Sequence, residues 1–143
     1  MIKLDDVIMC MEMSSEENCS YYNTTSNKIV NIFFNEVNNE EDEDALEIIE
    51  DGDIPEYYIS LPDKYDIDEY HIMQEFIYSL EDEFIQDELL DAINGRRAFR
   101  RFKDTLYEYG IENKWYEYRD KAYRKIALDW LDANNIKYEE WMV

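Results

Sequence analysis

Three glycines restrict the fold of this chain more than any other feature. The chain has 143 residues, and its only glycines are Gly52, Gly95 and Gly110. Glycine adopts the left-handed backbone conformation at helix C-termini without strain, so each glycine predicts the end of a helix or segment. Around the last two, apolar side chains recur three and four positions apart, which predicts helices over about 96–109 and 112–133.

Two further helices are predicted before Gly95. The run Asp66-Ile67-Asp68-Glu69 has the form of a capping box, so a helix should start there. A break over residues 79–82 separates it from a second helix that ends at Asn94-Gly95. The apolar faces are Met73, Phe76, Ile77 and Leu80 in the first helix and Phe84, Ile85, Leu89 and Ile93 in the second.

The N-terminal part predicts a helix followed by strands. Residues 4–12 place Leu4, Val7, Ile8 and Met11 on one helical face. Residues 19–23 and 28–34 are rich in β-branched and aromatic side chains, and the turn residues 24–27 between them predict a β-hairpin. Residues 57–61 predict a third strand, which Pro62 stops.

These elements predict an α+β fold in which a small antiparallel sheet of about three strands packs against a helical C-terminal half. A chain of 143 residues is of ordinary size for one domain, so residues 1–143 are expected to form a single domain. In the last two helices we expect Phe99, Phe102, Trp115 and Trp130 to be buried.

Charge is divided unevenly along the chain. Residues 1–95 hold 27 Asp and Glu against three Lys, whereas residues 96–143 hold 11 Lys and Arg against nine acids. The net charge of −22 therefore lies in the first two thirds. Residues 35–56 alone contain 11 acids and no base, which predicts an acidic loop. The apolar residues Ala45, Leu46, Ile48 and Ile49 indicate that part of this segment is ordered.

Basic residues gather at the start of the helix predicted over 96–109. The candidate binding surface consists of Arg96, Arg97, Arg100, Arg101 and Lys103. One interpretation is a phosphate-binding face, because the forked donors of arginine suit phosphate groups. The simpler alternative is that this face supplies counter-charge and docks on the acidic half of the same chain, since a net charge of −22 repels nucleic acid at long range.

The helix predicted over 112–133 has an apolar stripe with a cation near its middle. The stripe consists of Trp115, Tyr118, Ala122, Ile126, Trp130 and Ala133. Arg119 projects close to this stripe. Either its stem packs while its guanidinium reaches water, which we favour, or it pairs with an acid from the first part of the chain.

No catalytic site is visible in the sequence. There is no phosphate loop, dinucleotide-binding fingerprint or nucleophile elbow. The single histidine, His71, has no nucleophile that we can assign to it and is expected to be structural. The acidic runs lack the spacing of a calcium loop, so no metal site and no cofactor are predicted. Whether the protein is an enzyme stays open, although these absences favour a non-enzyme.

Cysteine spacing and hydropathy indicate a cytoplasmic protein. Cys10 and Cys19 lack the C-x-x-C spacing of redox and zinc motifs, and free thiols are expected. No apolar run approaches the ~20 residues that span a bilayer, and the first residues lack the pattern of a signal peptide. No membrane association is expected.

Several segments resemble a known family. The run Ile59-Ser60-Leu61-Pro62-Asp63-Lys64-Tyr65-Asp66-Ile67-Asp68-Glu69-Tyr70 and the later G-x-x-A-F-R-R-F-K-D motif of Gly95–Asp104 are similar to an uncharacterised protein family of small acidic bacterial proteins. The pair Trp115-Tyr116 and residues 126–130 also resemble it, so the similarity extends over nearly the whole chain. The acidity of residues 35–56 is heavier than the family pattern requires. The resemblance implies a bacterial cytoplasmic origin and supplies no activity, cofactor or catalytic residue.

Three functions are therefore considered. The first is a non-enzymatic protein-binding module, regulatory or inhibitory, with an unidentified partner. The second is an acidic nucleic-acid mimic that inhibits a DNA-binding or defence protein, which requires carboxylates on ordered elements. The third is nucleic-acid binding through the basic residues 96–103. The sequence leaves the oligomeric state open.

Overall fold

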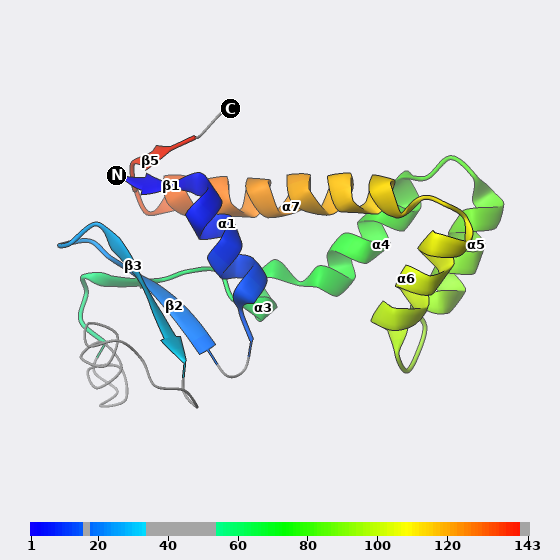
Figure 1. The fold of residues 1–143 in the computed structure, drawn as a ribbon, viewed down its shortest axis with the longest axis horizontal. Helices are drawn as coiled ribbons and strands as arrows, with labels where there is room; N and C mark the ends of the chain where they lie inside the picture. The colour runs from blue at the N-terminus through cyan, green and yellow to red at the C-terminus, as the bar shows by residue number, and fades with distance from the viewer. Residues whose placement is uncertain (16–17, 34–53, 141–143) are drawn as a thin grey trace. The chain divides into compact units, whose positions relative to one another are not determined.

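The structure is a computed structural model that describes residues 1–15, 18–33 and 54–140. The chain divides into two compact units (Figure 1). The sheet unit comprises Met1–Ile67 and Tyr123–Val143, and the helical unit comprises Asp68–Ala122. The predicted α+β class is confirmed, since the chain has a three-stranded antiparallel sheet and a helical C-terminal half. The extent of the domain as residues 1–143 stays a prediction.

The sheet unit contains the predicted hairpin and third strand. Strands β2 (Asn18–Asn23) and β3 (Lys28–Phe33) pair antiparallel, and β4 (Tyr58–Ser60) joins the other edge of β2, giving the order β3-β2-β4. The turn fits its residues, because the side chain of Asn23 accepts hydrogen bonds from the backbone of Thr25 and Ser26. Asn27, with a φ of 58°, closes the turn in the left-handed region, which asparagine tolerates.

A second, smaller sheet was not predicted. Strand β1 (Ile2–Lys3) pairs parallel with β5 (Tyr138–Glu139), with Ile2 opposite Tyr138. Each strand has two residues, too few to show an alternating pattern in the sequence. Helix α1 (Leu4–Met13) follows β1 directly and buries Leu4, Val7, Cys10 and Met11, so Cys10 takes the buried place that we expected for Ile8.

The capping box lies earlier than predicted. The side chain of Asp63 accepts from the amide of Asp66, and the carboxylate of Asp66 accepts from the amide of Asp63, which caps the short helix α3 (Lys64–Ile67). Helix α4 (Glu69–Ser79) has its own cap, Asp68, whose carboxylate accepts from the amide of His71. The prediction that Asp66 and Glu69 cap the long helix is therefore wrong.

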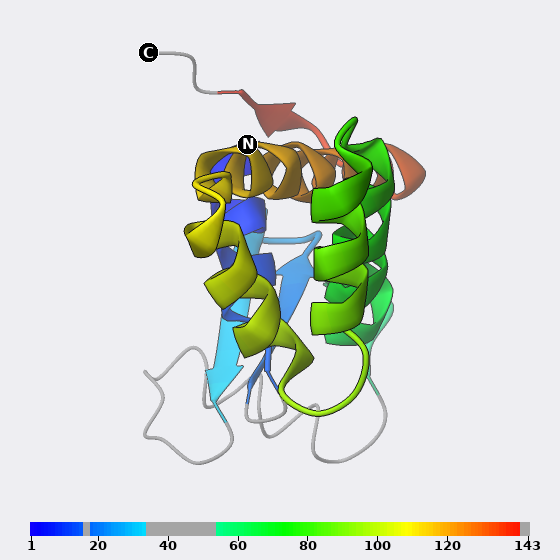
Figure 2. The ribbon, with the colours of Figure 1, turned by 90° about the vertical axis from the view of Figure 1, so that its right-hand side faces the viewer.

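The rest of the helical unit is formed by α5 (Glu83–Ala92), α6 (Ala98–Glu108) and the first part of α7 (Glu112–Ala133). The predicted break at residues 79–82 and the bounds of α7 are confirmed. Helices α5 and α6 lie side by side as an antiparallel hairpin (Figure 2). The rings of Phe84 and Tyr109 are in contact, with centroids 6.2 Å apart, which sets the start of α5 beside the end of α6.

Aromatic rings form the core of the helical unit. Phe102 and Trp115 are fully buried as predicted, and their ring centroids lie 4.9 Å apart in an edge-to-face arrangement. Phe76 contacts both rings and also that of Tyr118, with all three contacts edge-to-face. Such contacts add to the hydrophobic gain of burying the rings, which makes this cluster the main support of the unit.

Two of the four predicted core rings are not buried. Phe99 is 43% exposed, because it lies at the margin of the apolar side of α6, where buried Phe102 and Leu106 occupy the centre. Trp130 is half-buried, and its indole nitrogen donates a hydrogen bond of 2.9 Å to the backbone oxygen of Ser60 in β4. An indole N–H needs an acceptor, which keeps this side of the ring near polar backbone.

The buried line along α7 is displaced from the predicted stripe. After Trp115 the buried side chains are Tyr123, Ala127 and Leu131, whereas Ala133 is exposed and the other predicted members are half-buried. Two neighbouring rows of side chains along α7 are largely apolar, and in each row the residues are four positions apart. The predicted row begins at Tyr118, whereas the row that is mostly buried begins at Trp115. The buried row includes Arg119, so it appeared less apolar in the sequence than the predicted row.

Candidate binding surface

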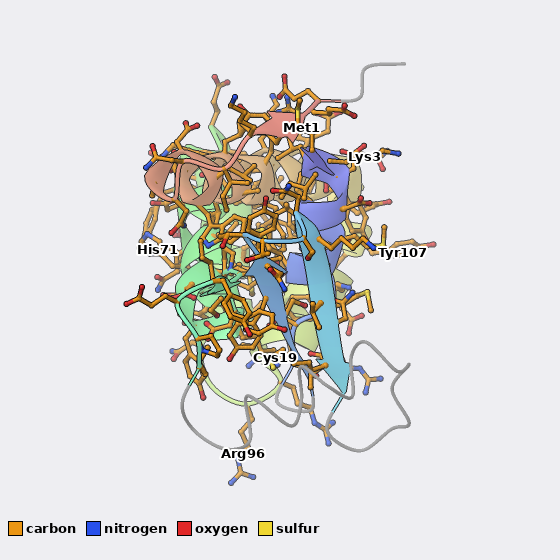
Figure 3. The ribbon with its side chains drawn as sticks, turned by 90° about the vertical axis from the view of Figure 1, so that its left-hand side faces the viewer. Met1, Lys3, Cys19, His71, Arg96 and Tyr107 are labelled. Carbon is orange, nitrogen blue, oxygen red and sulfur yellow. The ribbon has the colours of Figure 1, made fainter. Side chains whose placement is uncertain are left out.

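The five predicted site residues are brought together by the turn between α5 and α6. Arg96 and Arg97 precede α6 rather than lying in its first turn, since the helix begins at Ala98. The chain turns here through Gly95, with a φ of 101°, and Arg97, with a φ of 58°. Arg100, Arg101 and Lys103 lie on α6, and all five side chains are exposed. We call these five residues the basic patch; Arg96 points away from the ribbon (Figure 3).

Arg101 is engaged within the hairpin. Its guanidinium donates to the backbone oxygens of Asn94 and Asp91, each at 3.3 Å, and lies 3.9 Å from the carboxylate of Asp91. These carbonyls belong to the C-terminal end of α5, where the helix dipole favours a cation. Arg101 thus closes the hairpin, and four cations of the basic patch are left for other contacts.

Two exposed rings lie on the same side of α6 as the free cations. Lys103 follows Phe99 by four residues and Arg100 by three, and Tyr107 follows Lys103 by four. These spacings place the four side chains on one side of the helix. The ammonium of Lys103 lies 4.7 Å from the centroid of the Phe99 ring. Tyr107 is 77% exposed and Phe99 is 43% exposed. Cations beside accessible rings suit a surface that binds a partner.

Within residues 1–15, 18–33 and 54–140, no ion pair is found for Arg96, Arg97, Arg100 or Lys103. The alternative was that the patch docks on the acidic half of the same chain. One observed contact agrees with it, that of Arg101 with Asp91 inside the helical unit. Residues 34–53, which carry most of the predicted acidic loop, lie outside the described residues, so that alternative stays a prediction.

Carboxylates gather at the opposite end of the hairpin. Asp82 caps α5 by accepting from the amides of Phe84 and Ile85, and Glu83 and Glu88 follow on α5. Partial desolvation raises the pKa of the Tyr109 phenol, and the nearby charges of Glu88, Glu108 and Asp82 raise it further. The carboxylates of Asp82, Glu88 and Glu108 therefore lie near the end of α6, a grouping that the sequence did not predict.

Arg119 forms the ion pair that was one of its two alternatives. Its Nε lies 2.7 Å from Oε1 of Glu69, and the side chains are 21% and 31% exposed. The acid comes from the first part of the chain and the cation from α7, so the pair fixes the start of α4 to α7 within the helical unit. We had favoured an unpaired guanidinium in water, which is wrong.

A groove of about 560 Å³ lies in the helical unit beside the α4–α5 junction. Its floor is apolar, from Phe76, Leu80, Ile85, Ile111 and Tyr118, and its rim includes Lys114, Lys121 and Glu117. Burial raises the pKa of the Tyr118 phenol, and the charge of Glu75 adds to this. The rim carries both signs of charge, so it selects no ligand of one sign. The groove was not predicted from the sequence, because its residues come from two separate stretches, 76–85 and 111–121.

Among the described residues, no nucleophile is placed beside His71. Its Nε2 lies 2.9 Å from Oε1 of Glu75 one helical turn away, and both side chains are exposed. The two cysteines belong to the sheet unit and are free thiols, as predicted. Burial raises the pKa of Cys10, and its hydrogen bond to Ser20 lowers the pKa by a smaller amount. The raised pKa disfavours the reactive thiolate.

The described part of the chain shows neither a cluster of metal ligands nor a membrane-spanning helix. Among those residues, no group of three or more His, Cys, Asp or Glu side chains is placed to hold a metal ion. None of the helices formed by the same residues is both long and apolar enough to cross a bilayer.

Comparison with known proteins gives a family without an assigned activity. Residues 1–140 match the family described as "Uncharacterised protein family (UPF0158)". A stretch of 50 residues is 40% identical to UPF0158 protein PA5073 of the bacterium Pseudomonas aeruginosa, and this stretch covers 34% of the present chain and 33% of that protein. No solved structure matches. Because the family match extends over nearly the whole sequence, the chain belongs to the uncharacterised protein family UPF0158.

Proposed function

We propose that this chain is a non-enzymatic protein-binding module, regulatory or inhibitory, and that the basic patch with Phe99 and Tyr107 is its contact surface. The proposal rests on one observation, the exposure of four patch cations that have no ion pair among the described residues. Four cations on or beside an ordered helix are exposed next to two exposed rings, and among the described residues none of the four has an ion pair. Rings and arginines are enriched where protein surfaces bind one another.

Charge indicates what the partner surface looks like. The patch attracts carboxylates, whereas the net charge of −22 repels any strongly acidic partner as a whole. The fitting partner is a protein that offers a few carboxylates and an apolar side chain on a surface that is otherwise neutral or basic. Its carboxylates would accept from Arg96, Arg97 and Arg100, and its apolar group would rest on Phe99. We place this interaction in the bacterial cytoplasm, as the family resemblance implies.

The test compares two variants that lose the same charge. The patch variant replaces Arg96, Arg97, Arg100 and Lys103 with Ala and keeps Arg101, which closes the hairpin. The control variant replaces the exposed residues Lys28, Lys64, Lys114 and Lys137 with Ala. Immobilised wild-type protein and both variants are incubated with nuclease-treated lysate of the source bacterium, and captured proteins are quantified by mass spectrometry.

A protein captured by the wild type and the control variant, but at least ~10-fold less by the patch variant, supports the proposal. Tenfold corresponds to about 1.4 kcal/mol, which is modest for the loss of four charged contacts. Capture that is equal for all three proteins refutes the patch as the contact surface.

Nucleic-acid binding through the same patch is the second candidate, and the position of Lys103 over the ring of Phe99 favours it. Exposed rings beside cations are the elements with which proteins bind unpaired bases, such as those in the loop of an RNA hairpin. Fluorescence anisotropy with a short mixed-sequence duplex and an RNA hairpin, at low and at physiological salt, tests it. Binding that falls steeply with salt and is lost in the patch variant would replace the first proposal; no binding at either salt would exclude it.

The nucleic-acid mimic stays a weaker alternative. It requires carboxylates on ordered elements, and α5 carries Glu83, Asp87, Glu88 and Asp91 within ten residues. Most of the acidic segment 35–56, on which the alternative mainly rested, lies outside the described residues. The same capture experiment tests it with a further variant in which the α5 carboxylates are replaced by amides. The mimic predicts that the patch variant still captures the partner protein and that the α5 variant does not.

A further inference from the structure

The α5–α6 hairpin carries opposite charges at its two ends. At the loop end, Arg101 contacts Asp91 and Asn94, and Arg96, Arg97 and Arg100 lie close to it in the sequence. Lys103 follows at the middle of α6, and none of these last four cations has an ion pair among the described residues. At the open end, the contact of Phe84 with Tyr109 brings the start of α5 to the end of α6. The carboxylates of this end are Asp82, Glu83, Glu88 and Glu108.

The two ends are far enough apart to act separately. A helix of eleven residues such as α6 is about 16 Å long, whereas charges in water are screened beyond about 8 Å at physiological salt. Each end also exposes an aromatic ring, since Phe84 is 64% exposed at the open end and Phe99 is 43% exposed near the loop end. Each end therefore offers a ring and an excess of one sign of charge, because cations outnumber Asp91 at the loop end and carboxylates outnumber Lys114 at the open end.

We propose that the open end of one hairpin binds the loop end of the hairpin in a second copy of this chain. Two hairpins placed antiparallel about a two-fold axis make this contact twice, because each copy contributes both ends. The occupant is a second copy because the same hairpin carries the complement of each of its ends. This inference does not depend on the proposed function.

The proposed dimer is weak. The face of two short helices is small beside the ~1,200 Å² or more that stable interfaces bury, and the net charge of −22 on each copy opposes association. Added salt screens this overall repulsion first and the close contacts later, so association is strongest at intermediate salt. Because the dimer covers the basic patch, self-association and partner binding exclude one another.

Charge reversal at each end provides the test. The acid-reversed variant carries Glu83→Lys, Glu88→Lys and Glu108→Lys. The base-reversed variant carries Arg96→Glu, Arg100→Glu and Lys103→Glu. None of these six residues forms an ion pair within the described part of the chain, and all six are exposed, so the fold should tolerate the changes. The control variant reverses Lys28, Lys64 and Lys137, which are also exposed and belong to the sheet unit.

Sedimentation velocity from 5 to 500 µM measures association. The wild type and the control variant are expected to shift from monomer towards dimer over this range, while each end-reversed variant stays monomeric at least ~10-fold higher in concentration. An equimolar mixture of the two end-reversed variants is expected to dimerise, because each end again meets its opposite. The variant with all six reversals is expected to dimerise as the wild type does.

Several outcomes would overturn the inference. These are a wild type that stays monomeric at 500 µM at every salt concentration, dimerisation of either end-reversed variant alone at wild-type concentrations, and failure of the equimolar mixture to associate. Circular dichroism first establishes that each variant is folded. A variant that is not folded is replaced by one with Gln at the same three positions, for which loss of dimerisation is again expected and wild-type dimerisation would refute the proposal.

Discussion

Each of the two compact units is stabilised from within, and the contacts inside one differ in kind from those inside the other. The helical unit has a core of mutually edge-on rings, Phe76, Phe102, Trp115 and Tyr118, and places its charges on the outside. The sheet unit buries mainly aliphatic side chains and methionine, such as Leu4, Met11 and Leu131. Strand pairing and polar contacts within the hairpin, such as Ser20 with Asn31, add to this core. Loss of volume should therefore destabilise both units, most where an aromatic ring is lost from the helical unit, and single hydrogen bonds should make smaller contributions in the sheet unit. Four residues of the basic patch, Arg96, Arg97, Arg100 and Lys103, should contribute little to either unit.

The largest effect is expected in the ring core. Phe102→Ala should lower the free energy of unfolding by ~3 to 5 kcal/mol, because the ring is fully buried between Phe76 and Trp115. Phe99→Ala, three residues before Phe102 and at the exposed margin of α6, should cost below about 1 kcal/mol. Urea denaturation of both variants measures the contrast, and equal losses would contradict the assignment of core and surface on α6.

The next effect concerns the ion pair of the helical unit. Glu69→Gln and Arg119→Gln should each lower the free energy of unfolding by about 1 to 2 kcal/mol, because the pair is neither fully buried nor freely solvated. A double-mutant cycle should give a coupling energy of about 1 kcal/mol. A coupling near zero would show that the two side chains act independently.

In the sheet unit, Trp130→Phe should cost about 1 kcal/mol. The substitution keeps most of the ring but removes the indole N–H that donates to the backbone oxygen of Ser60. Trp130→Phe therefore isolates one hydrogen bond between α7 and β4, whereas Phe102→Ala isolates volume. An unchanged unfolding midpoint for Trp130→Phe would mean that this bond does not stabilise the sheet unit.

The smallest effect is a dependence on alkaline pH in the sheet unit. Burial raises the pKa of Cys10 above its ordinary value of 9.0, so the folded state holds this proton more tightly than the unfolded state. The stability from this group is fully present below pH 9 and is lost as the pH rises through the folded pKa, with a slope of at most about 1.4 kcal/mol per pH unit. Cys10→Ala should flatten the decline in unfolding free energy between pH 8 and 10, and an unchanged slope would contradict this.

Local patterns predicted most of the fold. The bounds of α7, the break between α4 and α5, and the hairpin β2–β3 followed from periodicity, turn residues and glycine positions. Gly110 follows α6 with a φ of 66°, as a helix-ending glycine should. These features depend on residues close together in the sequence, which is why the sequence alone was enough.

Features that depend on distant residues were missed. The parallel pair β1–β5 joins the two ends of the described chain, and the row buried on α7 was mistaken because Arg119 finds its partner, Glu69, 50 residues away. Of the five predicted site residues, the sequence could not separate Arg101, whose partners lie at the end of α5, from the four that have no ion pair in the described residues. The carboxylates at the opposite end of the hairpin became visible only once α5 and α6 were placed side by side.

The central claim is that four residues of the basic patch, all except Arg101, are free for a partner and are not needed for folding. The most direct test is the free energy of unfolding of the variant with Ala at Arg96, Arg97, Arg100 and Lys103, measured against the control variant with Ala at Lys28, Lys64, Lys114 and Lys137. Both lose the same charge from exposed positions. We expect the two values to agree within about 1 kcal/mol, which allows for the contact of Lys103 with Phe99. A patch variant less stable than the control by more than about 2 kcal/mol would show that the patch supplies counter-charge to this chain's own fold.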